Sequence, residues 1–554
     1  MKNILCYLFV CLIASCAERT PKIKLIVNDE KLATIDDRLF GQFLEKPSWH
    51  GEGGPEAALV PGTHELQEGA LELMKGMNIP VLRFPGGSDV EHVDWTTMVD
   101  YAMDEKIRRP AYVGKNGDTV SANYGYDETG KLAEELGAEL ILVVNFGDAY
   151  HKRKSLEEAI AHESGLIAYC ALEAGVDLPG DLEKWTELRV KNGHPEPYPV
   201  KYIQIANEPW VMSKKELPIR GEIAPGPKEH YLRCLEAYID AFRQLAPGLK
   251  IIADGNCEGI TTPLRDRFGE KIDYLALHYY KPWKIRYVKK HGVETHRDSL
   301  SDREIFQGWA SVPEIDSNGF SVLDNNRFRT ARGPGYPIAM TEWNWNGWWN
   351  VDSTDPDNLG SYWAKGVGAA GFLHAMMRSG DFFHVGIQSM LVGNSWGITA
   401  IRVSPDAAFK PYPIPTGQVT ALYSNYHGND LLKLETVNIP TYNQPFDFNG
   451  IAEAEKVAYL DAICTRGRGR VYFHIINRHF TSGQEVELDL SALDVPFSKA
   501  VMRSLAGNYD NDDPCSNEPF RYACLQESEL ECKDEVIFCK LPPRSVSVIE
   551  VIEK

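Results

Sequence analysis

Two short segments of this 554-residue chain each end an apolar run with a carboxylate. In QIANEPW, residues 204–210, Asn207 and Glu208 follow the apolar stretch, and in MTEWNWNGWW, residues 340–349, Glu342 takes the same position. Two carboxyl groups about 5 to 5.5 Å apart, one protonated and one ionised, can break a glycosidic bond with retention of configuration. The two segments therefore predict acid/base and nucleophilic chemistry, if the fold brings Glu208 and Glu342 to one cavity.

Each glutamate also has a structural alternative, because it could cap a following helix or pair with an arginine such as Arg83. A single glutamate at the end of a strand would favour that alternative. Two of them, each among polar and aromatic neighbours, favour the catalytic interpretation. Repulsion between the carboxylates and partial burial would then raise the proton affinity of one while the other stays ionised.

Eight short apolar runs end in polar residues, which is typical of buried parallel strands. They lie at residues 39–45, 79–87, 138–147, 200–209, 249–255, 272–280, 336–344 and 382–390. Amphipathic stretches with helical spacing, such as residues 65–77 and 229–246, separate most of them. This alternation predicts an α/β fold, a (β/α)8 TIM barrel over residues 36–405. A doubly wound open sheet is the alternative, but no GxGxxG turn follows the early strands.

In such a barrel Glu208 ends the fourth strand and Glu342 the seventh, so both should face the same mouth. Residues 285–333 interrupt the pattern and predict an excursion over that mouth. From residue 406 to residue 554 the runs alternate as in an antiparallel β-sandwich domain. A strand at residues 22–28, within a linker segment of residues 17–35, is expected to add to the sandwich.

The first sixteen residues, MKNILCYLFVCLIASC, combine an early lysine, a short apolar run and small residues before a cysteine. The run is shorter than the roughly 20 residues that cross a bilayer, so it predicts a signal peptide. IASC resembles a bacterial lipobox, which would make Cys16 the lipidated first residue of the mature protein. An ordinary secretory signal is the alternative. We expect an exported, periplasmic or outer-membrane-anchored lipoprotein that meets the membrane only through its N-terminal lipid.

The composition limits the classes of molecule that the protein is expected to bind. A formal net charge of −20 disfavours nucleic acid, because an anionic surface has few cations with which to displace counterions from phosphates. A neutral substrate is expected instead. In an oxidising compartment four cysteines of the tail could form one or two disulfides, whose pairing stays open. They are Cys515, Cys524, Cys532 and Cys539.

Six segments together resemble the clan A glycoside hydrolases, and most of all the family 51 α-L-arabinofuranosidases. They are GQFLEK, VLRFPGG, NYGYDETGKLAEELGAELILVVNFG, ANEPW, ALHYY and TEWN, and the likeness extends from about residue 22 to the final strand. The resemblance implies a retaining, double-displacement hydrolase of oligo- or polysaccharides that needs no metal and no organic cofactor. Members of this family are often homo-oligomers. No HxH or HExxH motif points to a metal-dependent hydrolase.

Position by position, the resemblance implies that Glu208 is the general acid/base and Glu342 the nucleophile. Asn207 would bind the sugar 2-hydroxyl, Tyr280 would hold the nucleophile, and Glu45 would bind hydroxyls at the non-reducing end. Three further residues have implied roles in binding the sugar or supporting the carboxylates, and each has a purely structural alternative: Gln388, His278 and Arg83. Trp343 and Trp345 could stack on sugar rings, although at least one of them is expected in the core.

Departures from the family pattern leave the sugar open. Ser88 and Asp89 follow the RFPGG segment where the family usually has asparagine, and Ala206 stands where glycine is common. A clan A enzyme acting on a β-linked pyranoside, or inside a polysaccharide, is therefore one alternative. A non-catalytic glycan-binding lipoprotein is another, although such a protein has no need of two strand-end glutamates.

Overall fold

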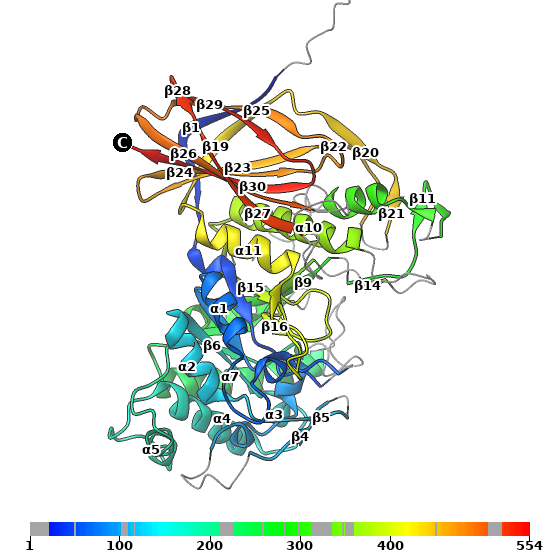
Figure 1. Ribbon diagram of the computed structural model, residues 1–554. Coiled ribbons are helices and arrows are strands. Elements are labelled where there is room, and N and C mark those ends of the chain that lie inside the picture. The colour runs from blue at the N-terminus through cyan, green and yellow to red at the C-terminus, as the bar shows by residue number, and fades with distance from the viewer. Residues whose placement is uncertain are drawn as a thin grey trace, which may run out of the picture.

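Eight parallel strands form a closed barrel in the computed structural model of the chain (Figure 1). In chain order they are β2 (Gly41–Phe43), β3 (Val81–Phe84), β6 (Glu139–Val144), β7 (Val200–Ile205), β8 (Lys250–Asp254), β9 (Tyr274–Tyr280), β13 (Ile338–Asn344) and β15 (Phe383–Ser389). Each lies inside one of the eight runs expected from the sequence. The predicted fold class is thereby confirmed.

The structure describes thirteen stretches of the chain. They are residues 22–48, 51–100, 109–115, 117–209, 225–256, 260–281, 283–296, 299–311, 335–345, 348–349, 359–448, 451–507 and 523–554. The expected signal peptide with Cys16, much of the expected excursion over residues 285–333, and Cys515 lie outside them. Within these stretches no helix is long and apolar enough to cross a membrane.

Helices cover the outside of the barrel (Figure 1). They include α1 (Glu68–Gly76), α2 (Tyr126–Leu136), α4 (Leu156–Ala171), α5 (Glu183–Lys191), α7 (Pro225–Leu245), α8 (Thr261–Phe268) and α10 (Leu359–Arg378). Local sequence sets their ends: Ser155 and Glu158 form a capping box at the start of α4. Gly137, with φ +66°, ends α2 in the left-handed conformation that glycine adopts readily.

The chain after the barrel forms a second, sheet-rich domain. Its strands are β19 (Asp430–Val437), β23 (Leu460–Gly467), β24 (Arg470–Asn477), β25 (Gln484–Ala492), β26 (Phe497–Gly507), β27 (Ala523–Leu530), β28 (Cys532–Lys533), β29 (Val536–Leu541) and β30 (Ser545–Glu553). The N-terminal strand β1 (Ile23–Thr34) completes a ten-stranded sheet by pairing antiparallel with β19 and parallel with β25. Apolar side chains from β1, β24 and β25 pack in one core cluster, as a sandwich requires.

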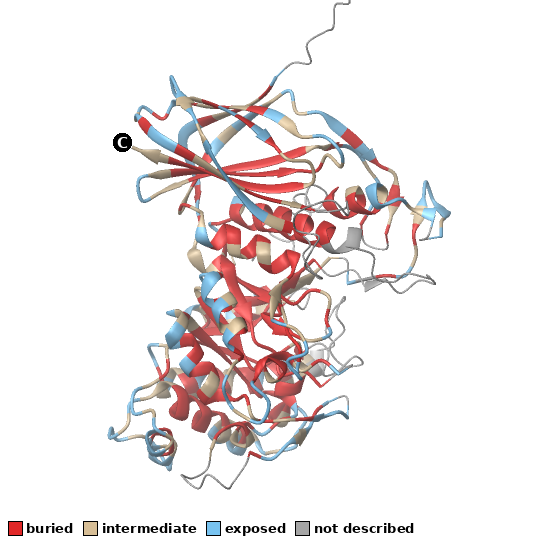
Figure 2. Ribbon diagram, viewed as in Figure 1, coloured by how far each residue is buried: buried red, intermediate tan, exposed pale blue. Residues whose placement is uncertain are grey.

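Two helices connect the domains. α10 and α11 (Pro415–Asn425) lie between the barrel strands and the sheet, and the buried residues continue through both (Figure 2). On α10, Trp363 donates a hydrogen bond from Nε1 to the carbonyl of Arg544, 2.7 Å away, and packs against Gly507 of β26. The sheet is therefore fixed to the barrel by packing and by hydrogen bonds to backbone groups.

The tail cysteines are only partly oxidised. Cys524 is disulfide-bonded, whereas Cys532 and Cys539 carry free thiols. Of the alternatives left open by the sequence, two disulfides within the four-cysteine tail are wrong, because Cys532 and Cys539 are free.

Candidate active site

Glu208 and Glu342 meet at the carboxyl ends of the barrel strands. Glu208 follows β7, and Glu342 lies on β13 opposite His278 of β9 in the strand register. One oxygen of each carboxylate and a ring nitrogen of His278 all lie within 4.8 Å of one another. This separation fits a retaining pair, in which one of the two carboxylates attacks the anomeric carbon directly. It leaves no room for the water that attacks that carbon in an inverting enzyme.

Glu342 is surrounded by hydrogen-bond donors. Arg83 Nη1 donates to Glu342 Oε1 over 3.0 Å, and the Tyr280 hydroxyl donates to Oε2 over 2.9 Å. The arginine is fully buried and Glu342 is 6% exposed, so the ion pair is shielded from water. A cation and a hydroxyl donor both stabilise a negative charge. The setting therefore suits an ionised nucleophile, with Tyr280 and Arg83 placed as the resemblance implies.

Glu208 has a different environment. Burial raises the pKa of Glu208 from its usual 4.5 to about 7, while the charges of Lys115 and Arg83 pull the pKa down less strongly. Its backbone has φ +48°, an uncommon conformation for a residue with a side chain. A carboxyl group that holds its proton near neutrality can serve as a general acid. The two glutamates therefore lie in different surroundings, and burial rather than repulsion by the other carboxylate raises the pKa of Glu208.

His278 connects the two carboxyl groups. Its Nδ1 lies 2.9 Å from Glu208 Oε1 and 3.4 Å from Glu342 Oε2, and its Nε2 lies 3.0 Å from the Thr341 hydroxyl. Burial lowers the pKa of His278 to about 4, although the Glu342 charge opposes the shift. The ring is therefore neutral at neutral pH. It spaces the glutamates without adding a charge.

Arg83 lies at the bottom of the site and holds three side chains in place by hydrogen bonds. Besides its bond to Glu342, it donates from Nε to Gln204 Oε1 and from Nη2 to Asn207 Oδ1, each over 2.7 Å. Its guanidinium also lies over the Phe43 ring, 4.4 Å from the centroid. The amide nitrogen Nδ2 of the buried Asn207 has no hydrogen-bond partner within the described stretches. That nitrogen is a free donor next to Glu208, as a residue that binds a sugar hydroxyl requires.

Glu91 is a site residue that sequence reasoning missed. It is buried in the 3-10 turn Ser88–Glu91, and its Oε1 accepts a hydrogen bond from the Asn207 N–H over 2.7 Å. Its Oε2 accepts from the N–H groups of Phe146 and Gly147, over 2.8 and 2.6 Å. Glu91 thus joins the loop after β6 to the loop after β7 that carries the acid. No apolar pattern marks it in the sequence.

Glu45 lies just after β2. Its carboxylate rests so close to Gly87 that a Cβ atom there would come within 2.1 Å of Oε1. Burial raises the pKa of the Tyr280 hydroxyl, and the charges of Glu342 and, to a smaller extent, Glu45 add to the shift. Glu45 therefore lies near the residue that binds the nucleophile, in a position that suits the hydroxyl-binding role that the resemblance implies.

Trp343 and Trp345 cannot stack on a sugar. Both are 0% exposed, and both pack against Phe372 of α10 with ring centroids 5.1 and 6.1 Å away. Trp343 follows Glu342 on β13, so its side chain points to the opposite face, toward the helices. Trp345 rests on Gly368, where a Cβ atom would fall 1.9 Å from its Nε1. The predicted stacking role was wrong for both.

Gln388 also belongs to the interior. It is 0% exposed, its Oε1 accepts from Gln42 Nε2 over 3.1 Å, and its Nε2 donates to the Thr416 carbonyl over 3.3 Å. The structural alternative, a polar residue that closes the barrel, describes these contacts better than a sugar ligand does. An aromatic side chain that is exposed near the mouth is Trp283. It is 46% exposed, and its ring centroid lies 5.0 Å from that of Tyr280.

The same cluster is the one set of described residues with the spacing of metal ligands: Glu208, His278 and Glu342. Three features argue for hydrogen bonding instead. Arg83 and Tyr280 already donate to Glu342, and His278 Nε2 is engaged by Thr341. A dication would also have to lie next to the buried Arg83 guanidinium, which is unfavourable.

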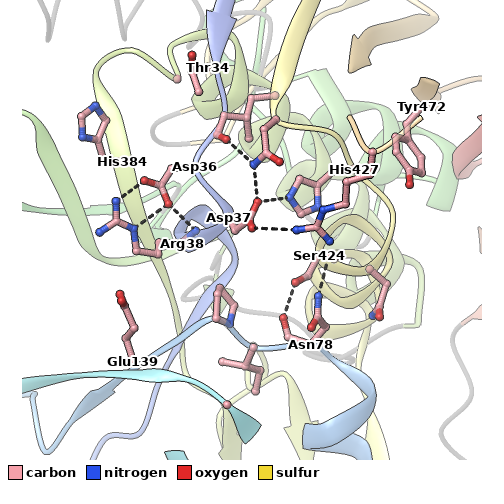
Figure 3. Close-up of a pocket in the computed structure, with 18 of the residues that line it drawn as sticks. Thr34, Asp36, Asp37, Arg38, Asn78, Glu139, His384, Ser424, His427 and Tyr472 are labelled. Carbon is pink, nitrogen blue, oxygen red and sulfur yellow. Dashed lines mark hydrogen bonds and ion pairs between the residues drawn. The ribbon is translucent and has the colours of Figure 1, made fainter. Parts of the chain in front are cut away.

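A larger hollow, of about 980 Å³, lies elsewhere (Figure 3). It opens near the amino ends of the barrel strands, between the barrel and the sheet, and several of its charged side chains pair with one another. Arg38 Nε donates to Asp36 over 2.8 Å, and His427 Nε2 lies 2.9 Å from Asp37. Since catalytic residues of such barrels come from the opposite, carboxyl ends, this hollow is a crevice of the domain contact.

A (β/α)8 barrel with two unlike glutamates at the ends of its fourth and seventh strands has the architecture of a clan A retaining glycoside hydrolase. The family model named Alpha-L-arabinofuranosidase 1 domain matches residues 73–297. The chain is 28% identical over 479 residues to alpha-L-arabinofuranosidase C of Emericella nidulans, a match that covers 83% of this chain and 86% of the relative.

A second curated relative is the intracellular exo-alpha-(1->5)-L-arabinofuranosidase of Acetivibrio thermocellus, with 26% identity over 268 residues and 46% of either chain covered. The chain thus spans about half the length of several curated relatives that it matches. The crystal structure of the GH51 alpha-L-arabinofuranosidase from Thermotoga petrophila superimposes with a TM-score of 0.68 at 22% identity, over 96% of this chain and 100% of the other, which establishes the shared fold. The chain is thus similar to the family 51 α-L-arabinofuranosidases, in agreement with its sequence motifs.

Proposed function

We propose that the protein is a retaining glycoside hydrolase that releases α-L-arabinofuranosyl units from polysaccharide-derived glycosides. The observation that carries the proposal is the pair Glu208 and Glu342, with oxygens within 4.8 Å and opposite electrostatic settings. The names of the relatives support arabinofuranose as the sugar. The separation of the carboxylates supports retention.

The reaction takes two steps. Protonated Glu208 gives its proton to the leaving oxygen while the Glu342 carboxylate attacks the anomeric carbon, so the glycosidic bond breaks and a glycosyl-enzyme ester forms. Glu208, now ionised, then removes a proton from water, which attacks the same carbon and frees Glu342. Arg83 and Tyr280 hold Glu342 in place throughout. The free Nδ2 of Asn207 donates to a sugar hydroxyl and orients the ring.

Two substitutions test these roles on a nitrophenyl α-L-arabinofuranoside. Glu342→Gln should lower turnover by at least about a thousandfold, because no ester can form. Glu208→Ala should be slow in its second step and should recover with azide, which needs no deprotonation and gives an arabinosyl azide. Glu187→Gln, on the exposed surface of α5, is the matched control and should behave as the wild type. Full turnover by Glu342→Gln would remove the nucleophile from the proposal.

The sugar is tested separately from the mechanism. A panel of nitrophenyl glycosides, with product sizing on polysaccharides, separates the arabinofuranosidase from the two alternatives. Release of single arabinose units supports the proposal. Faster cleavage of a β-linked pyranoside, or oligosaccharide products, would favour the other clan A activities. Binding without any product would favour the glycan-binding protein.

We also propose that the protein is exported and anchored through a lipid on Cys16. The proposal is supported by the lysine, the short apolar run and the IASC ending of the first sixteen residues. Labelling of growing cells with a fatty acid should mark the wild type and not Cys16→Ser. A homo-oligomer is likewise a prediction of the family resemblance, and light scattering of the purified protein measures it.

A further inference from the structure

A small cavity opens directly beside Glu208. Its volume is about 160 Å³, several times the roughly 30 Å³ that one water occupies, which suits one sugar ring rather than an oligosaccharide. Glu208 and the buried Asn207 form one side of it, and neither Glu342 nor Tyr280 lines it. A general acid must reach the leaving oxygen. The cavity therefore lies where the leaving group would extend away from the nucleophile.

Four basic side chains line this cavity, which we call the basic pocket: His92, Lys115, His151 and Arg153. They come from separate loops, after β3, before β5 (Thr119–Val120) and after α3 (Gly147–Tyr150). Such a concentration stands out on a chain with 58 basic and 78 acidic residues. Lys115 and Arg153 carry fixed positive charges, and converging cations of this kind attract an anion.

Each fixed cation is placed to meet a ligand. Lys115 is exposed, and within the stretches that the structure describes its ammonium group forms no ion pair. Arg153 is held from behind, because its Nε donates to Asp148 Oδ1 over 2.7 Å and its Nη2 donates to the Glu91 carbonyl. Burial and the charges of Arg153 and Lys115 lower the pKa of His92.

Acidic groups stand behind the two fixed cations: Asp148 pairs with Arg153 on the side away from the pocket. Asp89 lies below Lys115, where it accepts hydrogen bonds from the Lys115 N–H and the Ser48 hydroxyl, over 2.6 and 2.8 Å. Burial raises the pKa of Glu91 to about 7, as it does for Glu208, so at mildly acid pH both are largely protonated. A carboxylate bound in the pocket would meet two fixed cations and a Glu208 that still carries its proton.

We infer that the basic pocket binds the carboxylate of a uronic acid residue, which is the sugar that leaves when the glycosidic bond next to Glu208 breaks. This inference rests on the proposed function, because it assigns the leaving-group side of the same site. The expectation of a neutral substrate then holds for the sugar bound at Glu342 and not for its neighbour. Ser88, at which the chain departs from the family pattern, also lines the pocket.

The test uses two substrates that differ only in charge: an arabinofuranosyl-galacturonic acid and its methyl ester. We expect the wild type to cleave the acid with a kcat/KM roughly threefold to tenfold above that of the ester at low salt, as one or two partly exposed ion pairs allow. In 0.5 M NaCl the ratio should fall toward one, because salt screens exposed charges. This measurement needs no variant.

Two substitutions locate the effect. Lys115→Gln should reduce the acid-to-ester ratio toward one. Lys154→Gln is the matched control: Lys154 pairs with the same Asp148 as Arg153 but does not line the pocket, so the ratio should keep its wild-type value. A change in the acidity of Glu208 or in the amount of folded enzyme affects the cleavage of both substrates equally, so it does not alter the acid-to-ester ratio of kcat/KM.

The outcomes are distinct. Cleavage of both substrates at equal rates in the wild type would overturn the uronate inference and leave the proposed function intact. Faster cleavage of an arabinofuranosyl-galactose sulfate than of the arabinofuranosyl-galacturonic acid would also overturn the inference, in favour of sulfate as the bound anion. Loss of the ratio in both lysine variants would show general electrostatic attraction rather than this pocket. Cleavage of neither substrate, nor of a nitrophenyl arabinofuranoside, would contradict the proposed function itself.

Discussion

The buried carboxylate of Glu91 accepts a hydrogen bond from the Asn207 N–H, 2.7 Å away, and so fixes the residue next to the proposed acid. With Phe146 and Gly147, three N–H donors share its two oxygens. Glu91→Gln would turn an NH₂ group toward at least one of these donors. We expect it to lower the free energy of unfolding by about 1 to 3 kcal/mol and kcat/KM by roughly tenfold to a hundredfold, measured by urea unfolding and steady-state kinetics.

Glu163 provides the control for Glu91. It is also buried, but within the described part of the chain its carboxylate accepts one hydrogen bond, from the Asn145 N–H at 3.1 Å. Glu163→Gln can keep that bond, so its effect on kcat/KM should be much smaller. Equal losses of activity in both variants would mean that Glu91 acts only through general stability.

Glu208 should make stability depend on pH. Its pKa of about 7 in the folded protein exceeds the usual 4.5, so the folded state holds the proton more tightly. The stability that this provides is full below pH 4.5 and is lost as pH rises toward 7. The glutamine of Glu208→Gln cannot ionise. The free energy of unfolding of this variant, relative to that of the wild type, should therefore be higher at pH 8 than at pH 4.5 by on the order of 3 kcal/mol.

Urea unfolding at the two pH values measures this difference. Glu91, whose pKa is also raised to about 7, is present in both proteins, so the comparison isolates Glu208. In the wild type kcat/KM should decline above pH 7, as the general acid loses its proton. A stability difference that is the same at both pH values would show that Glu208 ionises normally.

Tyr280 should contribute to catalysis through its hydroxyl alone. Tyr280→Phe removes the 2.9 Å bond to Glu342 Oε2 and keeps the ring. A hydrogen bond to a charged group contributes roughly 1.5 to 3 kcal/mol, so kcat/KM should fall roughly tenfold to a hundredfold. Tyr279→Phe is the control, since that ring stacks on Phe372 of α10, 5.3 Å away, and should change kcat/KM little. A Tyr280→Phe enzyme with full activity would contradict the assigned contact.

Glycine at position 206 should stabilise the protein relative to Ala206. Its φ of +72° costs a residue with a Cβ roughly 1 to 2 kcal/mol, whereas glycine costs about 0.5 to 1 kcal/mol in backbone entropy. Ala206→Gly should therefore raise the free energy of unfolding by about 0.5 kcal/mol and keep the enzyme active. Ala253→Gly on β8 is the control and should destabilise by about 1 kcal/mol. A loss of stability at both positions would show that the turn holds Ala206 without strain.

The sequence was most informative where a simple periodicity governs structure. Buried parallel strands need apolar runs, and such runs located all eight barrel strands. Polar residues at the ends of those runs have few structural uses, so Glu208 and Glu342 could be recognised. The place of Arg83 below them came from the family resemblance and not from a sequence pattern.

Contacts made by irregular segments could not be predicted in this way. Glu91 lies in a 3-10 turn, and its partners are backbone N–H groups of residues 55, 56 and 116 positions away, which leave no trace in side-chain pattern. The error on Trp343 had a signal that was available: neighbours on a strand point to opposite faces, so the residue after an inward Glu342 must face outward. Lys115 and Arg153 come from separate loops, and only the fold shows that they share a pocket.

The stereochemistry of hydrolysis tests the central claim most directly, because it depends on how Glu208 and Glu342 share one anomeric carbon. Proton NMR should follow the first minutes of cleavage of an aryl α-L-arabinofuranoside, before the released sugar mutarotates. We predict that the α anomer of arabinose appears first, since two successive displacements retain configuration. Initial release of the β anomer would mean a single displacement by water and would contradict the assignment of Glu342 as the nucleophile.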